Sequence, residues 1–107
     1  METLAVPDWI AKRDLLYSPK GSSERLPFSV CVYAPYELTE GSVDFPLWPG
    51  AAGCLVQTFG LPQEVIKTAY GADTVQALEI ACSMDILRRF DREIDFYFPD
   101  GGPYFDH

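Results

Sequence analysis

The segment from Glu64 to Phe90 reads EVIKTAYGADTVQALEIACSMDILRRF, and it decides the fold because a strand pattern passes directly into a helix pattern. Its first part alternates between two sets of side chains, as a strand does. Gly71 ends this alternation, and Asp73 is a residue type that caps helix N-termini. Gln76 stands three residues after Asp73, which is the spacing of a capping box.

The helix is expected over residues 74–90, where apolar side chains recur at helical spacing. This stripe consists of Ala77, Ile80, Ala81, Met84 and Leu87. Further apolar residues widen the stripe, so we expect that the sheet alone does not cover it. The remaining cover comes from the rest of the chain or from a second copy.

Upstream of this segment the sequence predicts three more strands, at residues 9–17, 28–33 and 53–59. The short turn at 60–63 makes the third strand an antiparallel hairpin with 64–70. A short fifth strand is expected at 94–98. This order predicts an α+β domain, in which one C-terminal helix packs on one face of an antiparallel sheet of about four strands.

Two segments lie outside these elements. Residues 34–52 form a long loop rich in proline and glycine, and residues 99–107 form an aromatic tail. A connection as long as the first is usually functional or disordered in a compact domain. Its aromatic residues, Phe45 and Trp48 among them, favour packing over disorder.

The chain has 107 residues, which fits one domain over residues 1–107, and it carries a formal net charge of −8. An acidic excess opposes binding to nucleic acid and to anionic membranes. No apolar run is long enough to span a membrane, and the first residues lack the features of a secretory signal. We therefore expect a cytoplasmic protein.

The stretch YGADTVQAL at residues 70–78 resembles a segment in a family of small bacterial α+β domains of unknown function. Those domains have sheet strands followed by a Gly-x-Asp-Ser-x-Gln-Ala-Leu helix start, and Thr74 stands where they usually have serine. The resemblance implies this fold and a bacterial origin. It brings no catalytic residue.

Residues with catalytic potential form no recognisable pattern. His107 is the single histidine and the last residue, and a chain end rarely holds the fixed geometry of a general base. The cysteines have no Cys-x-x-Cys spacing and are expected to be buried free thiols. They are Cys31, Cys54 and Cys82.

Alternating acids at Asp91, Glu93 and Asp95 resemble the opening of a calcium loop. Phe96 stands where that loop needs glycine, and Gly102 stands where it needs glutamate. We therefore expect no catalytic, cofactor-binding or metal-binding residues.

Acidic and aromatic residues give a candidate partner-binding set, because aromatic residues are enriched in the cores of protein interfaces. One group lies in the long loop and comprises Glu37, Glu40, Asp44 and Trp48. The other lies near the C-terminus and comprises Tyr97, Asp100, Tyr104 and Phe105.

These features favour a non-enzymatic interaction domain, of the kind found in immunity proteins or inhibitors, that binds a basic protein partner. The alternative is a small-molecule binder, or a small enzyme that uses carboxylate and tyrosine groups, with a pocket between the helix, the long loop and the tail. We expect a monomer, with a homodimer as the alternative, because copies that each carry −8 repel one another.

Overall fold

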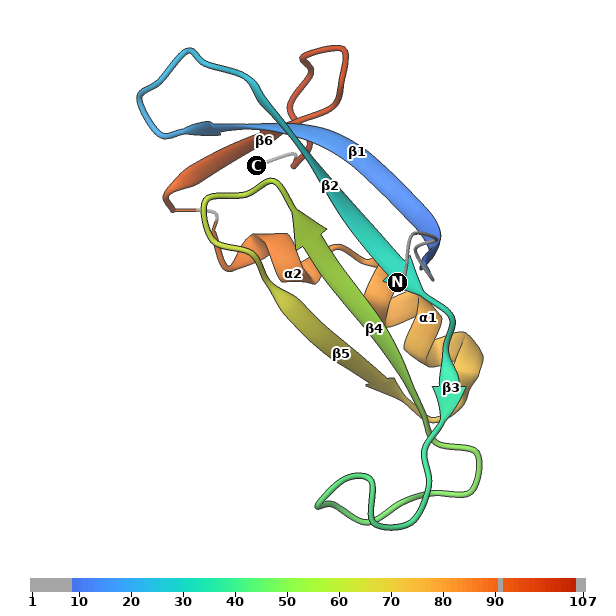
Figure 1. The fold of residues 1–107 in the computed structure, drawn as a ribbon. Coiled ribbons are helices and arrows are strands. Elements are labelled where there is room, and N and C mark those ends of the chain that lie inside the picture. Colours follow the sequence, from blue (N-terminus) through green and yellow to red (C-terminus); the bar gives the residue numbers. More distant parts are fainter. Residues whose placement is uncertain (1–8, 91, 106–107) are drawn as a thin grey trace, which may run out of the picture.

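The computed structural model describes residues 9–90 and 92–105 and combines an antiparallel sheet with helices on one of its faces (Figure 1). The strands are β1 (Trp9–Pro19), β2 (Leu26–Tyr33), β3 (Tyr36–Glu37), β4 (Ala52–Phe59), β5 (Ile66–Gly71) and β6 (Ile94–Tyr97). The helices are α1 (Thr74–Cys82) and α2 (Asp85–Arg88). The α+β class and the antiparallel sheet are confirmed.

The strand pairing runs from β5 at one edge to β6 at the other. β4 pairs with β5 on one side and with β2 on the other, and β1 lies between β2 and β6. β3 pairs with Ala52 and Gly53 of β4, which also pair with β5, so β3 must continue the line of β2. A one-residue register shift between β2 and β3 indicates a bulge near Pro35.

The predicted strand count was too low, because the sheet has six strands in the described part of the chain, where about four and a short fifth were expected. The fifth predicted strand is present as β6, and the expected hairpin is present as β4 and β5. β3 lies inside the predicted loop. Pro35 and the bulge interrupt the alternation of side chains before it, so the sequence shows no strand pattern there.

Side chains of the central strands alternate between a buried face and a more exposed one. Phe28, Val30 and Val32 of β2 point toward the helices, as do Cys54 and Val56 of β4. We call this side the helix face and the other side the open face. Both described helices lie on the helix face, where α1 packs against β4 and β5.

The helical segment is broken, whereas one continuous helix over 74–90 was predicted. The backbone of Met84 has a φ of 65°, in the left-handed region that residues other than glycine rarely adopt. The Met84 side chain is buried, and its packing holds the turn between α1 and α2. The break changes the direction of the chain, and Ile80 of the predicted stripe is 42% exposed.

The C-terminal tail folds back along β6. The Tyr104 amide donates to the Phe96 carbonyl at 2.9 Å, and the Phe98 amide donates to the Gly102 carbonyl at 2.8 Å. Tyr97 also forms an isolated bridge with Pro103. The outer side of β6 is therefore occupied by the chain itself.

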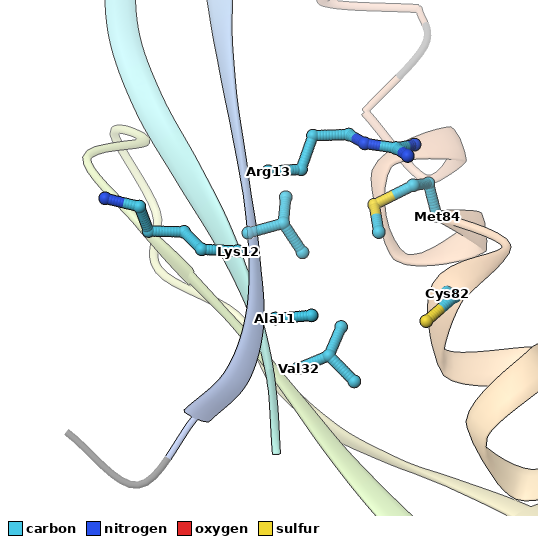
Figure 2. Close-up of a pocket in the computed structure, with 7 residues that line it drawn as sticks. Ala11, Lys12, Arg13, Val32, Cys82 and Met84 are labelled. Atoms are coloured by element: carbon cyan, nitrogen blue, oxygen red, sulfur yellow. The ribbon is translucent and has the colours of Figure 1, made fainter. Parts of the chain in front are cut away.

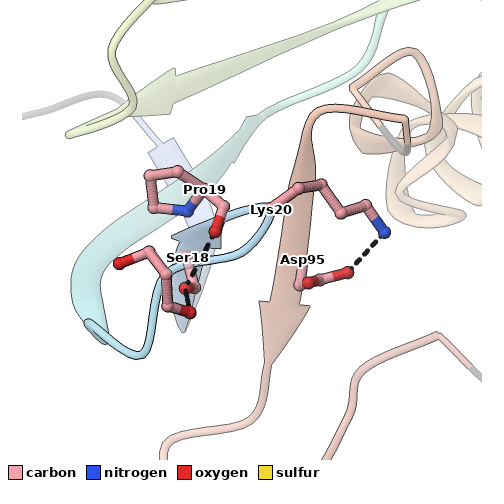
Figure 3. A network of polar contacts seen from close by, with 5 residues as sticks. Ser18, Pro19, Lys20 and Asp95 are labelled. Atoms are coloured by element: carbon pink, nitrogen blue, oxygen red, sulfur yellow. Dashed lines mark hydrogen bonds and ion pairs between the residues drawn. The ribbon is translucent and has the colours of Figure 1, made fainter.

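The other side of β6 is joined to the turn between β1 and β2 (Figure 3). Lys20 pairs with Asp95 at 2.6 Å, and its amide donates to the Glu93 carbonyl at 3.0 Å. The fully buried Ser18 hydroxyl donates to the Ser22 carbonyl at 2.8 Å. These contacts fix the turn against β6.

No helix within residues 9–90 and 92–105 is long and apolar enough to cross a membrane.

Candidate functional site

The long loop is closed at its neck and lies at one end of the molecule (Figure 1). The Leu38 amide donates to the Ala51 carbonyl at 2.9 Å, just beyond the pairing of β3 with β4. Inside the loop, the Ala51 amide donates to the Trp48 carbonyl at 2.9 Å, and the Ser42 hydroxyl donates to the Thr39 carbonyl at 2.6 Å. The sheet and these bonds together hold the loop as an Ω-type loop.

Aromatic side chains gather where the loop meets the end of β5. Phe45 packs edge-on against Tyr70, with ring centroids 5.3 Å apart. Trp48 is 76% exposed, so its packing contributes little to the fold. Tyr36 lies across Gly53 on the open face, where an added Cβ would lie 2.8 Å from the Tyr36 hydroxyl. The absence of a side chain at Gly53 lets the Tyr36 ring approach the sheet.

Phe45, Trp48 and Tyr70 border a depression of about 320 Å³ between the loop, β5 and the start of α1. We call it the aromatic depression; its lining includes Leu38, Phe45, Pro46, Trp48, Tyr70 and Gln76. Gln76 is the polar side chain of this set, and its Oε1 already accepts from the Ala72 amide at 2.6 Å. The depression therefore offers mainly apolar and aromatic contact.

The turn from β5 into α1 fixes one wall of the depression. The Asp73 carboxylate accepts from the Gln76 amide at 2.8 Å, which confirms the predicted N-cap. At Gly71 an added Cβ would lie 2.4 Å from the Ala77 nitrogen, so the first turn of α1 packs directly over this residue. Glycine is needed at this position because the helix backbone comes too close to leave room for a side chain.

Charge is distributed unevenly along the chain. Residues 26–87 contain seven acidic residues and one basic residue, so this segment carries −6 of the total −8. They are Glu37, Glu40, Asp44, Glu64, Asp73, Glu79 and Asp85, with Lys67 as the base. The loop, β5 and α1 all belong to this segment. The aromatic depression therefore lies in the acidic part of the molecule.

The C-terminal segment that carries Tyr97, Tyr104 and Phe105 lies away from the loop (Figure 1). Its aromatic side chains contact the protein's own arginines. The Arg13 guanidinium donates to the Tyr104 hydroxyl at 2.7 Å. Arg25 lies 3.9 Å from the centroid of the Tyr97 ring, and Arg88 lies 4.5 Å from that of Phe105. These contacts give the aromatic group a structural role.

The structure thus divides the predicted partner-binding residues into two separate groups. Glu37, Glu40, Asp44 and Trp48 are exposed and lie in or next to the loop. Tyr97, Tyr104 and Phe105 are half-buried, and the Asp100 carboxylate accepts from the Gly102 amide at 2.9 Å. Sequence reasoning missed Tyr36 and Tyr70 as members of the loop group. Tyr70 had a signal, since its place in the alternating strand predicted at 64–70 fixes the face to which it points. Tyr36 had none, because it lies in the segment that was predicted to be a loop.

A smaller depression of about 80 Å³ lies between β1 and the junction of α1 and α2 (Figure 2). Arg13, Cys82 and Met84 are among its lining residues, while Lys12 extends from the other side of β1. Cys82 is exposed, so the prediction that it is buried was wrong. Cys82 lies in α1 on the side away from Ala77 and Ala81, the residues of this helix that are buried.

The other two cysteines are buried free thiols, as predicted. Burial raises the pKa of the Cys31 thiol, and burial also raises the pKa of the Cys54 thiol. The Cys54 thiol donates to the Tyr33 carbonyl at 3.1 Å. Both groups are therefore poor nucleophiles at neutral pH.

Within residues 9–90 and 92–105, no three His, Cys, Asp or Glu side chains form a group able to hold a metal ion. His107 and Asp91, considered above as chemical groups, lie outside the described residues. Of the other acids in the calcium-like pattern, Asp95 is paired with Lys20.

Comparison with family models, curated proteins and solved structures gives no match to this chain. The resemblance carried by residues 70–78 stays a prediction.

Proposed function

We propose that this domain binds a basic segment of a protein partner through the aromatic depression and the acidic loop around it. The observation that carries the proposal is Trp48. It is a large aromatic side chain, 76% exposed, on a loop that the backbone holds in place. An exposed tryptophan supplies a large apolar contact that no described part of the fold requires, and tryptophan is enriched among binding hot spots.

Charge determines the class of partner. Glu37, Glu40 and Asp44 are exposed in and beside the loop, and residues 26–87 carry −6. Lysine and arginine side chains complement this surface, and their cations also interact favourably with aromatic ring faces. An acidic inhibitor or immunity-like protein that covers a basic site on its target has these features.

A small apolar ligand is the second candidate, because the depression of about 320 Å³ is at the lower end of the usual size for ligand pockets. Such pockets also contain a few polar groups that orient the ligand. Gln76 would be one, but its carbonyl oxygen is already bonded to the Ala72 amide. The balance of lining residues therefore favours a protein partner over a small molecule or a substrate.

Reduced thiols fit a cytoplasmic location for this function. Cys31, Cys54 and Cys82 are all unpaired. Disulfides are rare in the cytosol because the thiol pools there keep cysteines reduced. We propose that the domain meets its partner in that compartment as a monomer.

The test is selection of binding peptides from a random library with the full chain as bait. We expect enrichment of lysine and arginine over aspartate and glutamate, and we expect Trp48→Ala to weaken the selected peptides by at least about tenfold. Because Trp48 is so exposed, the substitution should change the free energy of unfolding by less than about 0.5 kcal/mol.

Phe59→Ala is the matched control, since Phe59 is another exposed aromatic residue but lies at the opposite end of β4 from the loop. Binding should survive this change. Peptides with no basic preference, or equal losses with Trp48→Ala and Phe59→Ala, would contradict the proposal. Selection of apolar, uncharged sequences that compete with small aromatic compounds would favour the second candidate.

A further inference from the structure

We propose that the partner adds to the sheet as an extended strand along β5, with one end anchored at the aromatic depression. This inference rests on the proposed function, and it specifies the backbone geometry by which the basic segment binds.

The hydrogen-bond phase of β5 leaves alternate backbone groups pointing away from β4. The Thr58 amide donates to the Val65 carbonyl at 2.9 Å, so residues 58 and 65 are a hydrogen-bonded pair. Such pairs alternate along an antiparallel ladder. The amides and carbonyls of Ile66, Thr68 and Tyr70 therefore face outward. No hydrogen bond from the described part of the chain reaches these groups.

Both sides of this edge offer contacts to an added strand. On the open face, Ile66 is 60% exposed and Tyr70 is 46% exposed. On the helix face, a depression of about 50 Å³ lies between β5 and the helices, and Lys67, Ala69, Ile80 and Asp85 help to line it. An added strand points alternate side chains to the two faces. One set of its side chains therefore meets Ile66 and Tyr70, and the other set meets the helix-face depression beside Asp85.

Charge selects a basic partner over a second copy. Two copies would each bring −8 to the contact, and Lys67 is the one basic residue of β5. A basic strand instead meets Asp85 beside the helix-face depression and the loop acids beyond Tyr70. Edge-strand addition of this kind combines backbone hydrogen bonds with side-chain pockets, which supply affinity and specificity respectively.

Amide hydrogen exchange on the full chain tests this geometry. The probe is a capped peptide of about seven residues that alternates lysine and valine, a length that covers β5. The control peptide has glutamate in place of lysine. We expect the basic peptide to slow exchange at Ile66, Thr68 and Tyr70 by at least about tenfold, because these amides gain bonds. The amides of Lys67 and Ala69 face β4 already and should change little.

Thr68→Pro removes one outward amide and should weaken the basic peptide by at least about tenfold, since proline is tolerated at such positions on edge strands. Thr68→Val keeps both the amide and the branched side chain, so it should bind as the unmodified domain does. If Thr68→Pro does not fold, peptides N-methylated at alternate residues make the same test. Methylation of the residues whose amides face β5 should abolish binding. Methylation of the other residues, whose amides face away from β5, should preserve it.

Three results would overturn the strand-addition geometry. Binding that perturbs Trp48 and Tyr36 but leaves the outward β5 amides unprotected would refute this geometry alone and leave the proposed function standing. Equal behaviour of the lysine and glutamate peptides, including no binding by either, would overturn both proposals. Protection of the β5 amides that rises with protein concentration, without peptide, would show that a second copy occupies the edge.

Discussion

The two edges of the sheet differ in whether another segment of the chain covers them. At the β6 edge the chain folds back, and the amides of Phe98 and Tyr104 bond within the 96–104 turn. At the β5 edge no described segment covers the outward backbone groups of Ile66, Thr68 and Tyr70. Exposed edges invite pairing with other chains, so natural proteins usually protect them. Of these two edges, the one formed by β5 therefore leaves backbone groups without a hydrogen bond from the described part of the chain.

The first half of β1 is a second stretch of strand with one unpaired side. β1 before Leu16 has no pairing with β6, and it carries Lys12, Arg13 and Asp14 in succession. Consecutive charges discourage edge-to-edge association. β5 has Lys67 alone, between exposed Ile66 and half-buried Thr68. Of these edges, β5 is therefore the most open to a strand of complementary charge.

The largest expected effect is at Gly71, where the open edge turns into α1. Gly71→Ala should lower the free energy of unfolding by about 3 kcal/mol, because the new Cβ would press against the backbone of the first helical turn. Urea unfolding followed by circular dichroism measures the change. Gly102→Ala at the closed edge is the control, since its nearest neighbour is the Asp100 carboxylate at 3.3 Å, which can move. Equal effects at both positions would contradict the tight packing over Gly71.

Removal of residues 99–107 should convert the closed edge into an open one. We expect a loss of about 2 kcal/mol, since the half-buried rings of Tyr104 and Phe105 leave the core. We also expect association at higher concentration, because the outer side of β6 becomes available. Light scattering and urea unfolding of the truncated and full-length chains measure both changes.

Tyr104→Phe is the matched control, because it keeps the ring and removes only the hydroxyl that accepts from Arg13. It should stay monomeric and lose less than the truncation. A full-length dimer that becomes a soluble monomer on truncation would show instead that the tail is an interface between copies.

Local features of this fold could be predicted from the sequence, because short patterns determine them. The β4–β5 hairpin follows from its turn, and the start of α1 follows from the Asp73 cap. The break at Met84 could not be predicted, because methionine is a good helix former and nothing in the local sequence indicates that this buried residue has a left-handed backbone.

Contacts between distant segments were also beyond sequence reasoning. The pairing of β1 with β6, and the return of the tail along β6, join residues far apart in the chain. Trp48 was recognised as a candidate from its place in the loop. Tyr70 was assigned only to its strand, because its contact with the loop joins segments that are far apart in the chain. The loop brings Phe45 against Tyr70 only after β3 and β4 have paired.

The smallest expected effect concerns Asp14, one of the charged residues in the part of β1 that does not pair with β6. The Ser29 hydroxyl donates to the Asp14 carboxylate at 2.6 Å, and this bond, with a smaller contribution from Lys12, holds the pKa of Asp14 below its ordinary value. A carboxyl group whose pKa is lowered by folding stabilises the fold above its unfolded pKa. That contribution is lost as the pH falls through the lower pKa of the folded state. Ser29→Ala should therefore raise the pKa of Asp14 toward its ordinary value, as measured by NMR titration of the carboxyl carbon, and leave the neutral-pH spectrum of β5 unchanged. An unchanged pKa would show that the Ser29 contact does not set the charge state of this edge.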